Sequence, residues 1–208
     1  SRRHPMPKLG MQPIRRRQLI DATIASIHED GFAHTTISGI SRRAGLSSGI
    51  VAHYFDDKAG LLEATMRKLA EDLRRQLVER LARAESPEAR LAAIIDANLA
   101  DVQFTPEIMS AWLSFWGQVR HSPPLARIQR VYRQRMMSDL LHAAKLLLPP
   151  ESARRLAAGM AAMIDGLWMQ RALAGERAKP ADARAVAHGY LAIQLAALAP
   201  PAANGAET

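Results

Sequence analysis

The chain has 208 residues, of which 48% are hydrophobic and 23% charged, and this composition excludes a chain that is disordered along its whole length. Its 28 Lys and Arg residues outnumber its 20 Asp and Glu residues, which gives a net charge of +8 and favours an anionic partner, nucleic acid before a membrane surface. The absence of cysteine excludes disulfides and thiolate metal sites, and it suits the cytoplasm, where we expect the protein to act.

Both ends of the chain are expected to lie outside the fold. Residues 1–13 are basic and lack an apolar run, so we interpret them as a flexible arm or as a remnant that precedes a natural start at Met6. Residues 199–208 are small and polar, which is typical of a disordered tail. No stretch approaches the roughly 20 apolar residues of a membrane-spanning helix, so no membrane partner is expected.

Apolar residues recur at helical spacing along most of the chain, and strand-like alternation of any length is absent. Glycine or proline marks most of the joins between the periodic segments. The sequence therefore predicts an all-α fold of about nine helices. They run over about residues 14–31, 36–44, 47–54, 59–84, 87–101, 105–120, 123–148, 151–174 and 181–198.

The second and third predicted helices form a helix-turn-helix pattern. Thr36 and Ser47 stand at their N-cap positions, and Gly45 can adopt the left-handed conformation that the turn requires. Small residues, among them Ser48 and Gly49, leave the outer face of the second short helix flat enough to enter a major groove. An ordinary helical hairpin is the alternative, although it would not require such a small outer face.

Several motifs resemble the TetR family of repressors. Within residues 14–62 they are Ile20-Asp21-Ala22-Thr23, Gly31-Phe32, Thr35-Thr36-Ile37, residues 40–47 (ISRRAGLS) and residues 53–62 (HYFDDKAGLL). A wider resemblance, from Met6 to about Leu195, is to the choline-responsive members of that family. It is carried by residues 6–12, 14–23, 60–67, 111–116 and 164–168.

The resemblance implies a homodimer with a three-helix DNA-binding domain at residues 14–60 and a ligand-binding and dimerisation domain at residues 61–198. It also implies a repressor of the genes that convert choline to glycine betaine, bound to a palindromic operator and released by choline. No cofactor is expected, and choline is expected as an effector ligand. The alternative is a repressor that responds to another cationic or hydrophobic small molecule.

The expected DNA contacts follow from general chemistry. Hydroxyls and amides at helix starts hold phosphates, the start of the second short helix faces the bases, and basic side chains follow the backbone. The candidates are Arg16, Thr36, Ser38, Arg43, Ser47, Ser48, Gly49, His53, Tyr54 and Lys58. For single arginines a solvated charged face is equally compatible with the sequence. Many family members carry tyrosine where Ala52 stands and a larger polar residue where Ser48 stands, so base reading would rely on small contacts or on DNA shape.

The second half of the chain holds all three tryptophans. Trp112 and Trp116 share a helix face, as do Asp165 and Trp168, and aromatic faces with one carboxylate are the expected solution for a quaternary ammonium ligand. The candidate ligand-binding residues are Trp112, Phe115, Trp116, Tyr132, Asp165 and Trp168. Taken alone, such aromatics are more often core than cage, but a carboxylate in the apolar stretch around Asp165 is costly without a partner. Asn98, Asp101 and Glu107 are alternative polar partners.

Two further expectations concern assembly and chemistry. The last two predicted helices carry more apolar surface than one face needs, which favours a four-helix dimer interface, with burial inside one subunit as the alternative. The seven histidines are scattered, with no His-x-x-x-His pair. We identify no Gly-x-Ser-x-Gly nucleophile motif and no glycine-rich phosphate loop. We therefore expect neither an enzyme nor a metal site. A nonspecific nucleic-acid-binding or membrane-surface protein is the remaining alternative.

Overall fold

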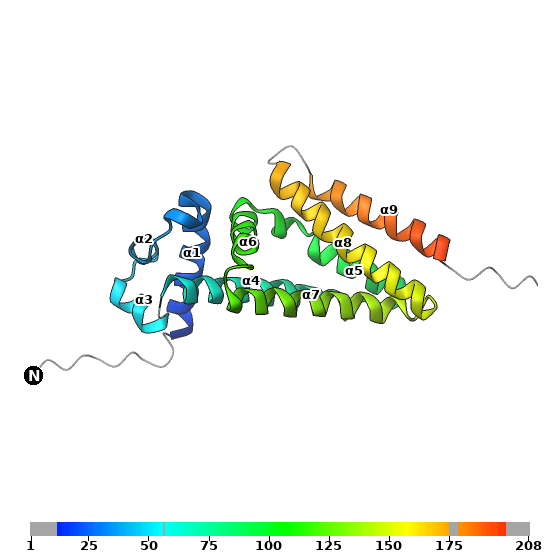
Figure 1. The fold of residues 1–208 in the computed structure, drawn as a ribbon, viewed down its shortest axis with the longest axis horizontal. Helices are drawn as coiled ribbons and strands as arrows, with labels where there is room; N and C mark the ends of the chain where they lie inside the picture. Colours follow the sequence, from blue (N-terminus) through cyan, green and yellow to red (C-terminus); the bar gives the residue numbers. More distant parts are fainter. Residues whose placement is uncertain (1–11, 56, 175–178, 199–208) are drawn as a thin grey trace, which may run out of the picture. The chain divides into compact units, whose positions relative to one another are not determined.

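The computed structural model describes residues 12–55, 57–174 and 179–198. Within these ranges the chain forms nine α-helices and one 3-10 helix, with no strand, which confirms the predicted all-α class (Figure 1). The helices are α1 (Gln12–His34), α2 (Ile37–Arg43), α3 (Ser48–Tyr54), α4 (Lys58–Leu81), α5 (Pro87–Asn98), η1 (Asp101–Phe104), α6 (Pro106–Gln118), α7 (Pro123–Ala144), α8 (Pro150–Ala174) and α9 (Pro180–Leu198).

Proline sets the starts of the later helices. Each helix from α5 to α9 begins at a proline, because the first helical residue needs no amide donor and proline already has a helical φ. The helix ends are less regular than predicted. α4 and α7 stop three and four residues early, where their last turns tighten into i to i+3 bonds such as that from the Leu146 amide to the Ala143 carbonyl (3.2 Å). At Gly31 the backbone leaves helical geometry (φ 74°, ψ 156°), and one further turn ends at His34.

The described chain packs as two compact units. The first comprises the described residues up to Glu71 together with Thr105–Gln129. In it α2 packs on α1 and α3 packs on α2, while α6 packs along α1. Its core contains buried side chains from α1 to α4: Leu19, Ala22, Ile40, Val51, Phe55, Leu61 and Ala64. The short helices α2 and α3 are therefore held by a shared apolar cluster.

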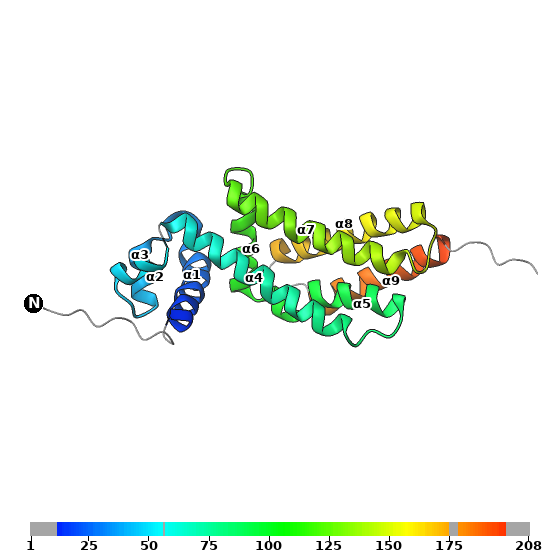
Figure 2. The ribbon, with the colours of Figure 1, turned by 90° about the horizontal axis from the view of Figure 1, so that it is seen from below.

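The second unit comprises Asp72–Phe104 and the described residues from Arg130 onward. α8 and α9 pack side by side (Figure 2). α9 also contacts α5 and η1. At Gly159 a Cβ would meet the Tyr190 hydroxyl at 2.7 Å, so the missing Cβ leaves room for the end of the Tyr190 side chain. Among the described residues, no helix has the length and apolar character needed to cross a bilayer.

Candidate nucleic-acid interface and ligand site

The turn between α2 and α3 has the local chemistry that the sequence predicts. The Thr36 hydroxyl accepts a hydrogen bond from the Gly39 amide (3.0 Å), so Thr36 is the N-cap of α2. Gly45 has a φ of 67°, in the left-handed region, and the Leu46 amide donates back to the Ser41 carbonyl (2.9 Å). These contacts reverse the chain within a few residues and present α3 beside α2.

One face of α3 is buried and the other is open to solvent. Val51 is fully buried in the core of the first unit, whereas Ser47, Ser48, Gly49 and His53 are exposed. Ser47 occupies the N-cap position as predicted, but the expected side-chain cap bond is absent. The Ile50 amide donates instead to the Ser47 backbone carbonyl (3.0 Å). The exposed face is small and polar, as a helix that enters a groove requires.

Residues 45–49 also have the Gly-x-Ser-x-Gly spacing of a hydrolase nucleophile elbow, a match that the sequence interpretation missed. In hydrolases that serine sits on a sharp turn from a strand to a helix. Here the segment joins two helices, and the described residues contain no strand. The spacing is therefore the glycine-rich turn of a helix-turn-helix and gives no support to an acyl-transfer site.

Arg43, a predicted DNA contact, makes a two-point ion pair inside the first unit. Its guanidinium donates to both carboxylate oxygens of Glu29 (2.7 and 2.6 Å) and to the Ser26 hydroxyl (3.1 Å). The hydrogen bond to Arg43 lowers the pKa of Glu29, and the same bond raises the pKa of Arg43. This fork geometry ties α2 to α1, and a phosphate contact by Arg43 stays a prediction.

Lys58 likewise has a partner within the first unit. Its ammonium donates to the Phe32 carbonyl (2.7 Å) and stands 4.5 Å from the centre of the Phe32 ring, which links the start of α4 to the end of α1. Burial lowers the pKa of the Lys58 side chain. Arg16 lies over the Phe55 ring at 4.9 Å. The DNA contacts of Arg16 and Lys58 remain predictions, as does that of the exposed Ser38.

The rings of His53 and Tyr54, at the end of α3, meet edge to face at 5.2 Å. The Tyr54 hydroxyl is buried and has no hydrogen-bond partner among the described residues. A buried hydroxyl without a partner is costly, and a phosphate contact by this atom requires the Tyr54 side chain to move first. Phosphate contacts by either residue stay predictions.

The six candidate ligand-binding residues divide equally between the two units. In the first unit α6 carries Trp112, Phe115 and Trp116. Trp112 lies edge to face with Phe115 (5.5 Å between ring centroids) and tilted against Trp116 (6.4 Å). Phe115 is fully buried and Trp112 nearly so, whereas Trp116 is half-buried. The predicted pairing of the two tryptophans along one helix face is therefore present, and Phe115 packs in the core.

In the second unit Trp168 stands against the 3-10 helix. Its indole N–H donates to the Gln103 carbonyl (3.2 Å), and its ring stacks on Phe104 at 6.4 Å with an interplanar angle of 23°. Sequence reasoning missed Phe104, because the contact joins residues far apart in the chain that no periodic pattern links. The only local signal was an aromatic residue directly before the Thr105-Pro106 helix start.

Asp165 lies one turn before Trp168 on α8 and has a cationic partner. A guanidinium nitrogen of Arg133 on α7 is 3.4 Å from the Asp165 carboxylate. Burial raises the pKa of Asp165, and the Arg133 charge partly opposes that rise. The pKa of Tyr132 is raised as well, first by burial and then by the charge on Asp165. Asp165 therefore favours a nearby cation, as the sequence predicts for a carboxylate in an apolar helix.

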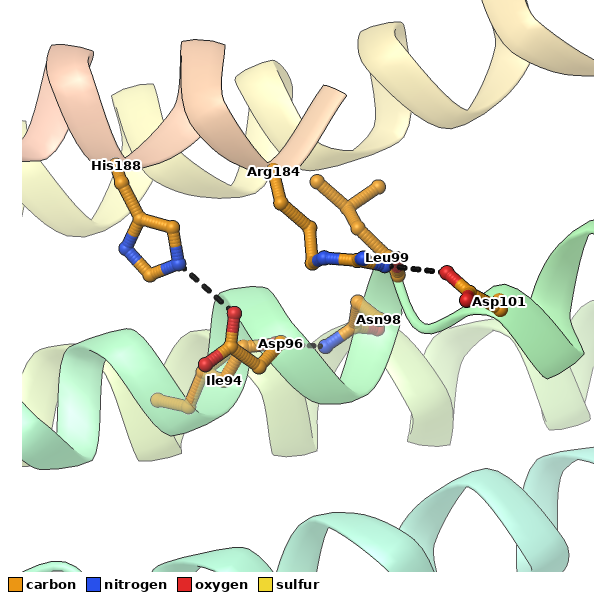
Figure 3. Close-up of polar contacts among 7 residues, drawn as sticks. All are labelled: Ile94, Asp96, Asn98, Leu99, Asp101, Arg184 and His188. Carbon is orange, nitrogen blue, oxygen red and sulfur yellow. Dashed lines mark hydrogen bonds and ion pairs between the residues drawn. The ribbon is translucent and has the colours of Figure 1, made fainter. Parts of the chain in front are cut away.

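The alternative polar partners Asn98 and Asp101 already have partners within the second unit (Figure 3). The Asn98 amide donates to the Ile94 carbonyl (2.8 Å) and accepts from the Tyr132 hydroxyl (2.9 Å). Asp101 accepts from Arg184 of α9 (2.7 Å), which also donates to the Leu99 carbonyl (2.9 Å).

Two other carboxylates, those of Asp96 and Glu107, can be compared with Asp165 as partners for a cationic ligand. Asp96 pairs with His188 of α9 at 2.8 Å (Figure 3), and Glu107 is exposed at the start of α6. A ligand contact by Asp165, by Glu107 or by the paired Asp96, Asn98 and Asp101 stays a prediction. Among the described residues, no three His, Asp or Glu side chains are grouped so that they could hold a metal ion.

Family models match both parts of the chain. Residues 19–71 match the N-terminal model described as bacterial regulatory proteins of the tetR family. Residues 87–196, more than half of the chain, match the model described as the C-terminal part of BetI-type transcriptional repressors. The first match covers the helix-turn-helix of α2 and α3, and the second extends from the start of α5 into α9.

Relatives of named function are similar over nearly the whole chain. The HTH-type transcriptional regulator BetI of Cronobacter sakazakii is 48% identical over 198 residues, covering 94% of this chain and 98% of the relative. That of Burkholderia thailandensis is 47% identical over 192 residues, with 92% and 98% covered. These relatives are transcriptional regulators, not enzymes.

Solved structures share the fold. A transcriptional regulator from Pseudomonas aeruginosa PAO1 has a TM-score of 0.78 at 24% identity, over 88% of this chain and 91% of the other. A transcriptional regulator from Saccharomonospora viridis in complex with choline has a TM-score of 0.76 at 20% identity, over 87% and 97%. The family models, the relatives and the fold agree, and the chain belongs to the TetR family of DNA-binding transcriptional regulators, in its BetI-type branch.

Proposed function

We propose that the chain is a repressor of genes that convert choline to glycine betaine, and that choline releases it from a palindromic operator. The observation that carries this proposal is the near-half identity to BetI regulators along almost the whole chain. The choline complex of the Saccharomonospora viridis regulator supports the choice of effector. We further propose that the protein acts in the cytoplasm as a homodimer, with α8 and α9 of each subunit forming the interface.

The proposed DNA contact uses the open face of α3. Ser47, Ser48 and Gly49 stand at its start and face the bases, while Thr36 and Lys58 hold phosphates on either side. Without a long side chain at Ser48 or Ala52, discrimination depends on the hydroxyls and on DNA shape. A dimer places two such helices in successive major grooves, with half-sites about 34–36 Å apart or a multiple of that spacing.

The proposed effector site in the second unit combines Asp165 with the stacked Trp168 and Phe104. A quaternary ammonium group has no N–H to donate, so it is recognised by Coulomb attraction and by aromatic faces, each face contributing on the order of 0.5–2 kcal/mol. Asp165 supplies a carboxylate that burial has made costly to ionise alone. Binding a cation removes that cost, which a neutral ligand of the same shape would not do.

Release by choline requires that the effector bind the DNA-incompetent state more tightly than the DNA-bound state. α4 is one continuous helix from Lys58 to Leu81, and its first turn touches α1 through Lys58. We propose that it carries the change from the effector site to the spacing of the two α3 helices. Choline and operator then oppose each other, and each weakens the binding of the other by the same factor.

The test is a mobility-shift titration on the DNA upstream of the protein's own gene, with and without choline. We expect a specific complex that choline dissolves and that excess random-sequence DNA does not. Glycine betaine and a neutral alcohol of similar shape test the effector's chemistry. Equal affinity for random DNA, or a complex that choline leaves intact, would overturn the proposal.

The contribution of the α6 aromatics is tested by Trp116→Ala. Trp116 pairs with Trp112 in the first unit, so this variant tests that pair separately from Asp165 and Trp168. We expect the choline response to weaken, because one face of the aromatic pair is lost, and operator affinity without choline to be kept, because Trp116 lies outside the helix-turn-helix. Calorimetric titration with choline measures the effect, and the mobility shift checks DNA binding. An unchanged choline titration would show that Trp116 is not part of the effector site.

A further inference from the structure

The Arg133–Asp165 pair differs from the Arg43–Glu29 pair in a way that matters for ligand binding. Arg43 grips both oxygens of Glu29 at 2.7 and 2.6 Å, a two-point geometry that fixes both side chains. Arg133 approaches one oxygen of Asp165 with one nitrogen at 3.4 Å, at the long limit of a hydrogen bond. The first pair has the geometry of a structural clamp, whereas the second is loose.

Burial of the two partners in this loose pair is unequal. The Asp165 side chain is 32% exposed, whereas that of Arg133 is 56% exposed. The guanidinium can therefore move into water at little cost, but the carboxylate cannot leave the second unit. Half-exposed pairs of this kind contribute little to stability. The carboxylate is the fixed member of the pair, and its cation is replaceable.

The aromatic part of the same region also attracts a guanidinium. Arg171 stands 5.8 Å from the centre of the Phe104 ring, and Phe104 is stacked on Trp168. An arginine over an aromatic face and an arginine on a carboxylate use the same two attractions that a quaternary ammonium ligand would use. The guanidinium groups of Arg133 and Arg171 thus already lie beside the carboxylate and the aromatic ring that we assign to the effector site.

We propose that Arg133 is a tethered competitor, whose guanidinium takes the place of the effector's cationic group on Asp165 and must be displaced when the effector binds. This inference rests on the proposed effector site. Displacement sets the effector concentration at which the repressor responds, because part of the attraction of Asp165 for the ligand replaces an existing attraction for Arg133. It also restricts the site to ligands whose cation competes with a guanidinium, so a neutral molecule of the same shape gains nothing from displacing it.

The test compares Arg133→Gln with Arg135→Gln by calorimetric titration of choline at pH 8. Both substitutions remove one positive charge from an exposed position on α7, but only Arg133 is paired with Asp165. We expect Arg133→Gln to tighten choline binding by about two- to fivefold, the range of a half-exposed ion pair. Arg135→Gln should leave it unchanged, and Arg133→Lys, which keeps the competing charge, should stay near the parent value.

A double-mutant cycle separates competition from general charge repulsion. In an Asp165→Asn background, Arg133→Gln should give no gain, because the contested carboxylate is absent. The uncharged choline isostere 3,3-dimethylbutan-1-ol should bind more weakly than choline to both the parent and the Arg133→Gln proteins, because it cannot replace the attraction of Asp165 for a cation. In the mobility shift, Arg133→Gln should move operator release to lower choline concentration. Thermal melting of each variant checks that it is folded.

The outcomes distinguish this inference from the proposed function. If the parent protein binds choline and Arg133→Gln binds it equally or more weakly, the competitor role is wrong and the effector assignment stands. An equal gain from Arg135→Gln, or a gain that persists with Asp165→Asn, would also overturn it. If choline binds only when Arg133 is replaced, the competitor role is supported. If choline binds no variant, the effector assignment fails and the competitor role fails with it.

Discussion

Lys58 shows how one side chain can serve both the fold and the binding of a polyanion. Its ammonium has three donors, and one of them holds the Phe32 carbonyl at 2.7 Å while the charge stands over the Phe32 ring. Burial makes the charged form more costly, which is why the pKa of Lys58 is lowered. A phosphate at this position would restore the favourable surroundings that the charge has lost.

Lys58→Ala should therefore weaken binding to operator and to random DNA alike, because a phosphate contact carries no sequence information. In a salt series measured by fluorescence anisotropy, the slope of log affinity against log salt should become shallower by about one. Arg127→Ala removes an exposed charge from α7 in the same unit and serves as the control. A parent-like slope in Lys58→Ala would mean that Lys58 only joins α1 to α4.

Asp165 predicts how effector binding depends on pH. Its pKa is raised by burial, against the opposing charge of Arg133, and only the ionised carboxylate attracts a cation. Choline affinity should be constant above this raised pKa and fall by up to about tenfold per pH unit below it. Binding should also release protons near the pKa, because the cation favours the ionised form.

Calorimetry in two buffers of different ionisation enthalpy measures that proton release. Asp165→Asn should bind weakly with a flat pH profile, since it has no carboxylate to titrate. The raised pKa of Asp165 also affects the free energy of unfolding in a defined direction. The folded protein holds the Asp165 proton more tightly than the unfolded chain, so this group stabilises the fold at low pH and the contribution is lost as pH rises through the raised pKa. A pH-independent choline affinity in the parent protein would separate Asp165 from the ligand.

At the scale of elements, the short helices depend on their connections. α2 and α3 each contain only seven residues, too few to be stable alone. They persist because Ile40 and Val51 enter the shared core and because Gly45 turns the chain between them. The turn conformation is thus part of what places the open face of α3.

Gly45→Ala should destabilise the protein by on the order of 1–2 kcal/mol, because the φ of 67° is strained for a residue with a Cβ. Added bulk is not the cause, since nothing lies within 4 Å of the new atom. Thermal denaturation should show a Tm lower by about 2–8 °C. Gly49→Ala is the matched control. Its added atom also meets open space, but its φ is not positive, so its Tm should not fall while operator affinity should.

The order of the helices and the turn between α2 and α3 could be predicted from the local chemistry of the sequence. Proline at helix starts, the Thr36 cap and the Gly45 turn each follow from the backbone preferences of one or two residues. Together with the helical spacing of apolar residues, they predicted the order and type of the nine α-helices in the described ranges. Contacts between distant segments could not be predicted in this way. The Trp168–Phe104 stack and the Arg133–Asp165 pair depend on how helices meet, which no periodicity records. The binding roles of single residues were inferred from general chemistry and from the family resemblance, and they stay predictions.

At the scale of the whole molecule, the proposed dimer makes a direct prediction. Val186 and Ile193 are seven residues apart on one face of α9 and are 52% and 66% exposed, although nearby α9 side chains such as Leu191 are buried within the subunit. An interface between subunits would cover this face. Burial inside one subunit therefore accounts for Leu191, and the dimer interface stays a prediction for Val186 and Ile193.

Ile193→Asp should shift the protein from dimer to monomer, because an interface would bury an unpaired carboxylate. Sedimentation equilibrium measures the change, and operator affinity should fall with it. Leu146→Asp places the same charge at a 61% exposed position beyond the end of α7 and should leave the assembly intact. A parent protein that sediments as a monomer would remove the dimer from the proposal.

The packing of α6 along α1 has a consequence for how the protein can be divided. The N-terminal family match ends at residue 71, yet residues 105–129 belong to the same compact unit, and the His28 ring meets the Ser110 hydroxyl at 3.0 Å. A fragment truncated after α4 would expose to solvent the surface of α1 that α6 covers in the intact chain, and this exposed surface would favour aggregation. A DNA-binding fragment that keeps this contact must therefore combine the described residues up to Glu71 with Thr105–Gln129, joined by a linker.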